Sequence, residues 1–154
     1  LCKMKKLLYL LIAFLPFLTS CDLETSDNGD FDGYWHLVGV DTLANAKHKD
    51  LSQQRIFWAV QFHLIQLRGA ERKDEGGNGR EYYEQFKLEQ SRLTLSNPHE
   101  KDREAGDPVI TEERLGEIRP YGINALTEHF DVLCLNKDEM ILKSSTLQLQ
   151  FRKQ

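Results

Sequence analysis

The sequence is poor in features that stabilise or anchor many small proteins, namely cysteine, proline and a long hydrophobic run. Its 154 residues include three cysteines and four prolines, and the formal net charge is −4. An acidic balance argues against nucleic acid as a partner, because phosphates demand a basic surface. The longest apolar run, residues 7–18, contains Pro16 and falls short of the roughly 20 residues that a transmembrane helix needs. Helical periodicity is nearly absent. We therefore expect neither a spanning helix nor a helical domain.

The first residues have the order of a bacterial export signal. Three lysines within the first six residues precede the apolar run, which ends in Leu18-Thr19-Ser20-Cys21. This stretch resembles the lipobox of bacterial lipoproteins. The resemblance implies transfer of a diacylglyceryl group to the thiol of Cys21 and cleavage before that residue. We therefore predict that residues 1–20 are a signal peptide and that Cys21 is the lipidation site.

Removal of residues 1–20 takes away three lysines and moves the net charge from −4 to −7. The remaining chain has the length of a single domain. Cys134 is then the only thiol besides Cys21, and its apolar surroundings predict a small buried hydrophobe rather than a reactive or metal-bound group. Met4 is an alternative start, in which case Cys2 is not part of the protein.

Residues 21–32 are acidic and poor in apolar side chains, so we predict a flexible tether. Membrane attachment then depends on the lipid on Cys21, since an acidic domain offers no basic patch to a bilayer. The acidic residues after the cysteine resemble the export signals of surface-displayed lipoproteins in Bacteroidetes, whereas Asp22 resembles an inner-membrane retention signal under enterobacterial sorting. We expect the protein at the cell envelope. If the acidic residues act as a surface-export signal, it lies at the outer membrane and is exposed on the cell surface. The leaflet stays open.

The rest of the chain is organised as short strands with turn residues between them. In the last one, Leu147, Leu149 and Phe151 alternate with polar residues, which is the period of a half-buried strand. Residues 55–68 form a long apolar run in which Trp58, Phe62 and Leu64 share one face. The alternation then slips, which predicts a bulge or bend near Ile65 and Gln66. The polar segment 41–54 predicts at most a short helical crossing, and one helical turn is expected at 111–115. The further predicted strands are residues 33–40, 82–89, 92–96, 130–135, 140–143 and 146–153.

About eight strands in an antiparallel meander suit a closed barrel or a sandwich. The Gly33-x-Trp35 start of the first strand, together with the tail from Tyr121-Gly122 through 140–144 to 149–153, resembles the lipocalin-like lipoproteins of Bacteroidetes. The resemblance implies an all-β, up-and-down, eight-stranded barrel over residues 33–154. It also implies an interior able to hold one small apolar ligand, and Arg152 as a cation over Trp35. The alternation of side chains along the last strand, taken alone, places Arg152 on the solvent-exposed face.

Aromatic side chains are the candidates for a ligand cavity, with core filling as the alternative. We predict a lipid-anchored, non-enzymatic protein that binds a small apolar or amphipathic molecule; the alternative is a structural or interaction lipoprotein with a filled barrel. An interior void with an open mouth favours the first, and a packed interior favours the second. We expect no enzyme, metal or cofactor, since the histidines lack ligand-like spacing and no nucleophile accompanies Glu128, His129 and Asp131. The cavity candidates are Trp35, Trp58, Phe62, Tyr83, Phe86 and Phe130.

Overall fold

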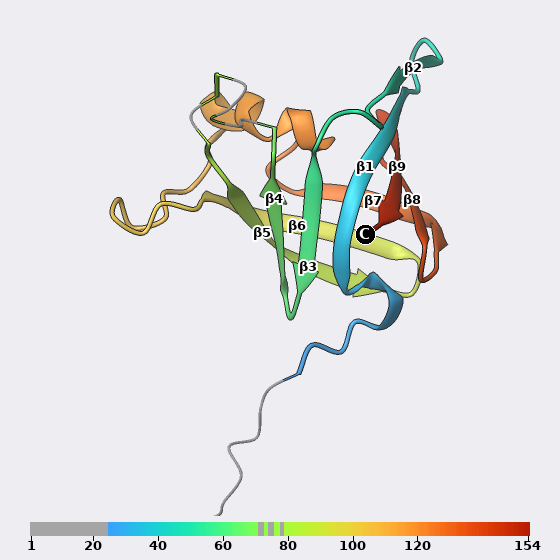
Figure 1. Ribbon diagram of the computed structural model, residues 1–154, viewed down its shortest axis with the longest axis horizontal. Helices are drawn as coiled ribbons and strands as arrows, with labels where there is room; N and C mark the ends of the chain where they lie inside the picture. Colours follow the sequence, from blue (N-terminus) through green and yellow to red (C-terminus); the bar gives the residue numbers. More distant parts are fainter. Residues whose placement is uncertain (1–24, 71–72, 74–75, 78) are drawn as a thin grey trace, which may run out of the picture.

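The computed structural model describes residues 25–70, 73, 76–77 and 79–154, and its strands form one antiparallel sheet (Figure 1). Their order is β2-β1-β3-β4-β5-β6-β7-β8-β9, and an additional β1–β9 pairing closes eight of them into a barrel. The predicted fold class is therefore confirmed. The strands are β1 (Gly33–Thr42), β2 (Lys47–Asp50), β3 (Phe57–Gln61), β4 (Leu64–Arg68), β5 (Tyr82–Glu89), β6 (Arg92–Glu100), β7 (Glu128–Leu135), β8 (Glu139–Lys143) and β9 (Leu147–Lys153).

Strand β1 closes the barrel, because it pairs with β3 on one edge and with β9 on the other. Its first residues pair with β3, and its last four pair with β2 on the same edge. The other edge pairs with β9, with a register shift between Leu37 and Gly39. Such a bulge increases local twist, which a strand needs to close a barrel. The predicted helical crossing at 41–54 is wrong, because part of it is the exposed strand β2, whose polar residues lack an apolar alternation.

The predicted bulge or bend near Ile65 and Gln66 is also wrong, because both residues pair regularly with β3. The chain reverses at Phe62 and His63 instead, and Gln61 pairs with Leu64 across this two-residue turn. The turn shifts the side-chain alternation, so that Ile65 is buried while Leu64 is 43% exposed. The slip seen in the sequence was real, but it marks a hairpin rather than a bend.

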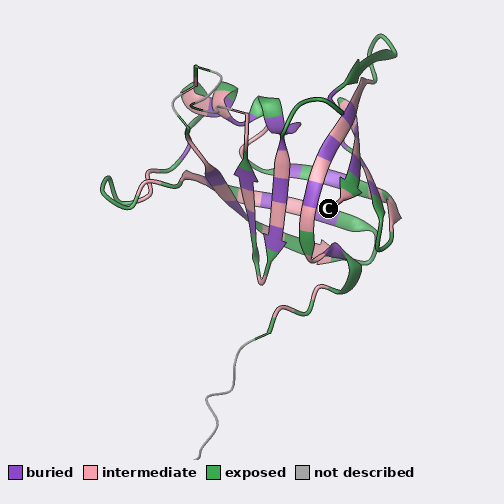
Figure 2. Cartoon of the chain, viewed as in Figure 1, coloured by how far each residue is buried: buried purple, intermediate pink, exposed green. Residues whose placement is uncertain are grey.

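The interior of the barrel is mainly apolar, with Glu84 and Glu128 buried in it, and 3-10 turns lie at its ends. Buried residues recur along the strands between half-buried and exposed ones (Figure 2). At one end Phe31, in the 3-10 turn η2 (Gly29–Phe31), is buried beneath β1. At the other, the turns η4 (Glu112–Glu117) and η5 (Arg119–Tyr121) bury Leu115 and Tyr121. The Trp58 indole N–H donates to the Tyr121 carbonyl at 3.1 Å. The predicted helical turn at 111–115 is confirmed by η4.

A lysine, not Arg152, lies over the first-strand tryptophan. The Lys153 ammonium is 4.7 Å from the centroid of the Trp35 ring, whereas Arg152 is exposed. The implied position is wrong by one residue because side chains alternate along β9, and Arg152 points outward. Cys134 likewise departs from its prediction, since it is half-buried rather than buried.

The signal peptide and Cys21 lie outside the described residues. Of the predicted tether, the part from Thr25 onward contacts the barrel: Ser26 and Asn28 both bond to the β3–β4 turn, and the contacts of the domain thus begin before Gly33. None of the described segments forms a helix with the length and apolar content that a membrane crossing demands.

Candidate functional site

Three of the predicted cavity residues fill the interior. Trp35, Trp58 and Phe130 are each 0% exposed. A side chain that lines a ligand-sized void keeps surface accessible to a water molecule, so complete burial means that neighbouring atoms occupy the space. The Trp58 ring lies 4.8 Å from that of Phe151 and 6.1 Å from that of Phe130, centroid to centroid. These rings offer a ligand no free surface in this conformation, and their role in binding stays a prediction.

Phe86 packs against another aromatic ring. It is half-buried, and its ring meets that of Phe31 edge to face at 5.0 Å. The two remaining predicted residues, Phe62 and Tyr83, lie elsewhere. Both line a groove of about 400 Å³ on the outer wall of the barrel, which falls within the usual range of small-molecule sites.

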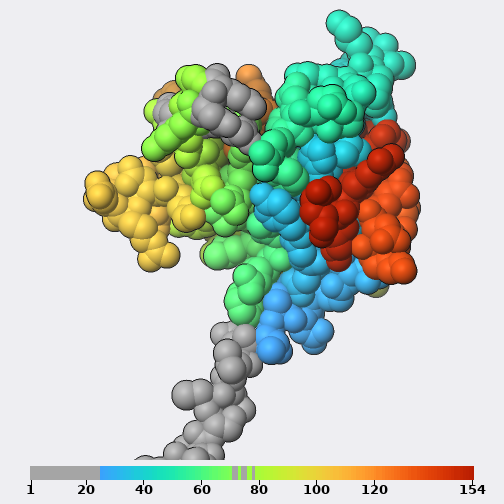
Figure 3. Space-filling view, in the orientation of Figure 1, coloured from blue at the N-terminus to red at the C-terminus, as the bar shows by residue number. Residues whose placement is uncertain are grey.

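Strands β3, β4 and β5 build the floor of this outer groove from the side chains that point away from the core. Ala59, Gln66 and Tyr83 lie in one row across the three strands, because they are direct cross-strand partners. Gln61 and Leu64 form the next row toward the β3–β4 turn. The loop 101–107 forms the far end, and Figure 3 shows it projecting in yellow beside the green strands. The groove is therefore made of a rigid wall and one loop.

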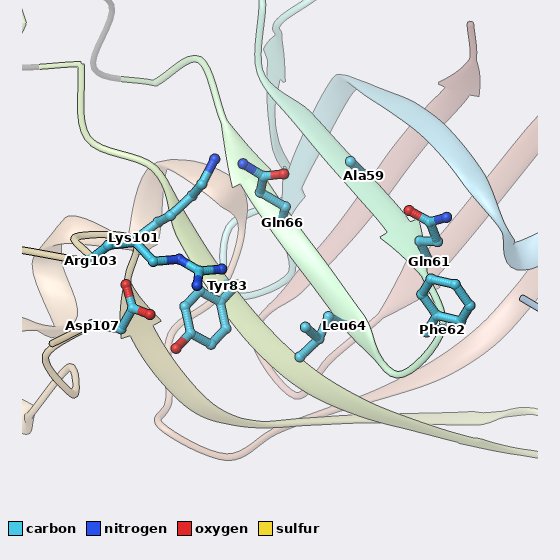
Figure 4. A pocket seen from close by; sticks show the side chains of 9 residues that line it. All are labelled: Ala59, Gln61, Phe62, Leu64, Gln66, Tyr83, Lys101, Arg103 and Asp107. Carbon is cyan, nitrogen blue, oxygen red and sulfur yellow. The ribbon is translucent and has the colours of Figure 1, made fainter. Parts of the chain in front are cut away.

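The end of the groove at the β3–β4 turn carries two apolar side chains and the amide of Gln61. Phe62 and Leu64 lie there, away from the charged side chains (Figure 4). Phe62 has φ +55°, a left-handed conformation that is unusual for a bulky residue and costs on the order of 1–3 kcal/mol. The turn is held from outside the sheet: the Phe62 N–H donates to the Ser26 hydroxyl at 2.7 Å, and the Asn28 amide donates to the Phe62 carbonyl at 2.8 Å.

The opposite end carries Lys101, Arg103 and Asp107 (Figure 4). Lys101 is ion-paired with Glu81 at 2.9 Å, whereas no ion pair among the described residues includes Arg103. One carboxylate oxygen of Asp107, Oδ1, is buried and has no hydrogen-bond partner among them. This end thus presents a guanidinium without an ion pair among the described residues, beside a carboxylate of which one oxygen is buried.

Tyr83 lies between the two ends. Its ring stacks on that of His99 with centroids 5.2 Å apart. Burial raises the pKa of its hydroxyl, the negative charge of Asp107 raises it further, and Arg103 acts in the opposite direction. The hydroxyl therefore stays protonated near neutral pH and is available as a hydrogen-bond donor.

Internal hydrogen bonds hold the loop 101–107 in shape. The Asp102 carboxylate accepts the N–H groups of Glu104 and Ala105 at 3.1 and 3.2 Å. The Asp107 N–H donates to the Asp102 carbonyl at 2.7 Å. A closed loop of this kind keeps Arg103 near the wall of the barrel.

Phe62 and Tyr83 were predicted for an interior cavity but line the outer groove, and the other groove residues were not predicted at all. Leu64 was assigned to the interior face because the hairpin position was misjudged. Arg103 and Asp107 sit in a mixed-charge segment that looks like ordinary solvated loop. Nothing in the sequence indicates that this loop lies beside β3 to β5, since that proximity arises only when the barrel closes. The missed residues are Ala59, Gln61, Leu64, Gln66, Lys101, Arg103 and Asp107.

A second polar feature lies inside the barrel. Glu84 is 0% exposed, and neither carboxyl oxygen has a hydrogen-bond partner among the described residues. Burial raises the pKa of Glu84 to about 8, and the charge of Glu128 adds to the rise. Glu128 is better placed, since its carboxylate accepts the N–H groups of Asn124 and His129 at 2.9 and 3.3 Å. Glu84 is thus held neutral at pH 7 inside an apolar core.

The residues weighed as a catalytic cluster do not converge. Glu128 points into the barrel, whereas His129 and Asp131 are exposed on its outer face. The His129 ring bonds to the Thr94 hydroxyl at 3.1 Å. Opposite faces of one strand cannot present these groups to a single substrate.

Comparison with known proteins agrees with this architecture. The model of a family described as lipocalin-like domain matches residues 16–154. A crystal structure of a lipocalin-like protein from Bacteroides uniformis is 17% identical, with 82% of this chain and 100% of that chain covered and a TM-score of 0.59. An uncharacterized protein from Bacteroides eggerthii is 18% identical, with 80% and 99% covered and a TM-score of 0.58. No curated protein matches. At these identities the solved structures establish the fold.

Proposed function

Because the chain belongs to the lipocalin-like domain family, we propose that it is a non-enzymatic binding protein that holds a small amphipathic ligand against the outer wall of its barrel. Fold alone does not define a ligand, so the proposal depends on the site. The observation that carries it is the outer groove, with Phe62 and Leu64 at one end and charged side chains at the other. The filled interior supports this placement, since Trp58 and Phe130 have no free surface.

The proposal includes an anchor at the cell envelope. A lipid on Cys21 would hold the domain at a bacterial membrane, most simply the outer membrane of a Bacteroidetes cell. The apolar end of the groove supports this arrangement, because Ser26 and Asn28, a few residues after Cys21, bind the turn that carries Phe62. The apolar end therefore lies beside the segment that leads to the anchor.

Docking of another envelope protein is the second candidate function. Its specific support is the filled barrel, which needs no ligand to be complete. The outer face also exposes single apolar residues away from the groove, such as Leu133 on β7, which is 54% exposed.

A matched pair of variants tests the first function. The lipidated protein would be purified from membranes as wild type, Leu64→Glu and Leu133→Glu, and the small molecules bound to each would be extracted and identified by mass spectrometry. Both leucines are exposed on the outer face, but only Leu64 lines the groove. We expect wild type and Leu133→Glu to carry the same amphipathic molecule, with at least tenfold less on Leu64→Glu. Nothing above background on wild type, or equal loading of all three proteins, would contradict the proposal and leave protein docking as the better account.

A further inference from the structure

The outer groove separates its apolar and charged surfaces along its length. At the turn end, Phe62 is half-buried and Leu64 is 43% exposed, so both retain apolar surface that water contacts. At the loop end, Arg103 and Asp107 lie beside the Tyr83 ring, and the charges of both act on the pKa of its hydroxyl. A ligand that covers the whole groove must therefore be apolar at one end and polar at the other.

The free charge at the polar end is a guanidinium. Lys101 is already paired, because Glu81 accepts from its ammonium at 2.9 Å. The same carboxylate also accepts from Arg68 at 2.8 Å and from the Gln66 amide at 2.7 Å. Arg103, in contrast, is exposed and has no ion pair among the described residues. An incoming anion consequently meets Arg103 without breaking an existing pair.

Asp107 limits how much negative charge the ligand can bring. Its carboxylate stands at the same end as Arg103, and with Lys101 balanced by Glu81 the local charge is close to neutral. A head with one negative charge gains the guanidinium contact, whereas a polyanion would be repelled by Asp107. The planar fork of an arginine also matches the two oxygens of a carboxylate.

Given the outer-wall site proposed above, we infer that its ligand is a single-chain amphipathic monoanion, with a carboxylate-type head on Arg103 and its apolar chain on Leu64 and Phe62. The Tyr83 hydroxyl donates a second hydrogen bond to the head. The apolar chain points toward Ser26 and Asn28, and so toward the side on which the chain continues to Cys21.

Three probes of equal chain length test the head group. Dodecanoate, dodecan-1-ol and dodecylammonium, each below its aggregation concentration, would be titrated into the whole lipoprotein in detergent-free nanodiscs by calorimetry. The proteins are wild type, Arg103→Gln and the matched control Arg92→Gln, which removes an exposed arginine on β6 that lines no part of the groove. Arg103→Lys keeps the charge and serves as a second variant whose folding is least disturbed.

We expect dodecanoate to bind wild type and Arg92→Gln equally and Arg103→Gln at least tenfold more weakly, with Arg103→Lys between them. Dodecan-1-ol should bind wild type and Arg103→Gln alike, and dodecylammonium should bind wild type more weakly than dodecanoate. Equal affinity of the three probes for wild type, or no loss with Arg103→Gln, would overturn the head-group inference while leaving the outer-wall site in place. Failure of all three probes to bind wild type would instead overturn the outer-wall site itself.

Discussion

The Lys153 ammonium stands 4.7 Å from the centre of the Trp35 ring and links the last strand of the barrel to the first. The two residues are direct partners in the β1–β9 pairing. The same ammonium donates to the Asp30 carbonyl at 2.8 Å, and the Trp35 indole N–H donates to the Phe31 carbonyl at 2.9 Å. The contacts of Lys153 and Trp35 thus connect β1, β9 and the turn η2, which covers one end of the barrel.

Replacing Lys153 with methionine should destabilise the domain by about 0.5–2 kcal/mol, because the cation loses its contact with the Trp35 ring. Arg152→Met is the matched control, since Arg152 is exposed on the opposite face of β9. We expect that variant to stay within about 0.5 kcal/mol of wild type. Urea denaturation followed by tryptophan fluorescence measures both. An equal effect of the two substitutions would show that the closing contact contributes nothing specific.

Stability should fall as the pH rises from about 4.5 toward about 8, and Glu84 should be responsible. The pKa of Glu84 in the folded protein is about 8, above its ordinary value of 4.5, because burial disfavours the charged form. The folded state therefore holds a proton that the unfolded state releases, which costs at most about 1.4 kcal/mol per pH unit across that range.

Glu84→Gln removes this titration while keeping the shape of the side chain. Its free energy of unfolding should lose most of the downward slope between pH 5 and pH 8. Glu89→Gln, an exposed position on the same strand β5, should keep the slope of wild type. Parallel curves for wild type and Glu84→Gln would mean that Glu84 titrates normally.

Arg114 should stabilise the cover over the other end of the barrel. Its guanidinium donates to both Glu100 and Glu117, and Glu117 also accepts from the Tyr82 hydroxyl at 3.1 Å. We expect Arg114→Met to cost about 1–2 kcal/mol at pH 7. The contact with Arg114 lowers the pKa of Glu117 below 4.5, so this contribution is present above that pH and disappears as Glu117 is protonated. Chemical denaturation at pH 7 and pH 3 measures it; an undiminished difference at pH 3 would contradict the ionic account.

Replacement of Cys21 with alanine tests the anchor. The variant should appear in the soluble fraction of lysed cells, whereas wild type should remain with the membranes and carry a lipid-sized mass increase on its amino-terminal peptide. Ser20→Ala keeps a small residue before the cysteine and should behave like wild type. Continued membrane association of Cys21→Ala would refute lipid attachment at that residue.

The barrel was predictable where one side of a strand faces the core. Leu149 and Phe151 alternate with polar residues and lie where the alternation places them. The β3–β4 hairpin was misplaced because Phe62 occupies a left-handed position where asparagine or glycine would have given a turn signal. That one misjudged turn moved Leu64 from the outer groove to the interior.

Other features depend on closure of the sheet and leave no local pattern. Glu84 lies on the same face of β5 as Tyr82, but its sequence neighbours do not say that this face is buried. Arg103 comes beside Tyr83 only through the fold of the loop 101–107. A single sequence gives no information about which residues far apart along the chain come close together in the fold.

Intermolecular nuclear Overhauser contacts between ¹³C-labelled protein and bound dodecanoate test the central claim most directly. The account predicts contacts from the alkyl chain to the Leu64 methyl groups and the Phe62 ring, with the Tyr83 ring near the carboxylate end. Contacts to Trp58 and Phe130 instead would place the ligand inside the barrel and contradict binding on the outer wall.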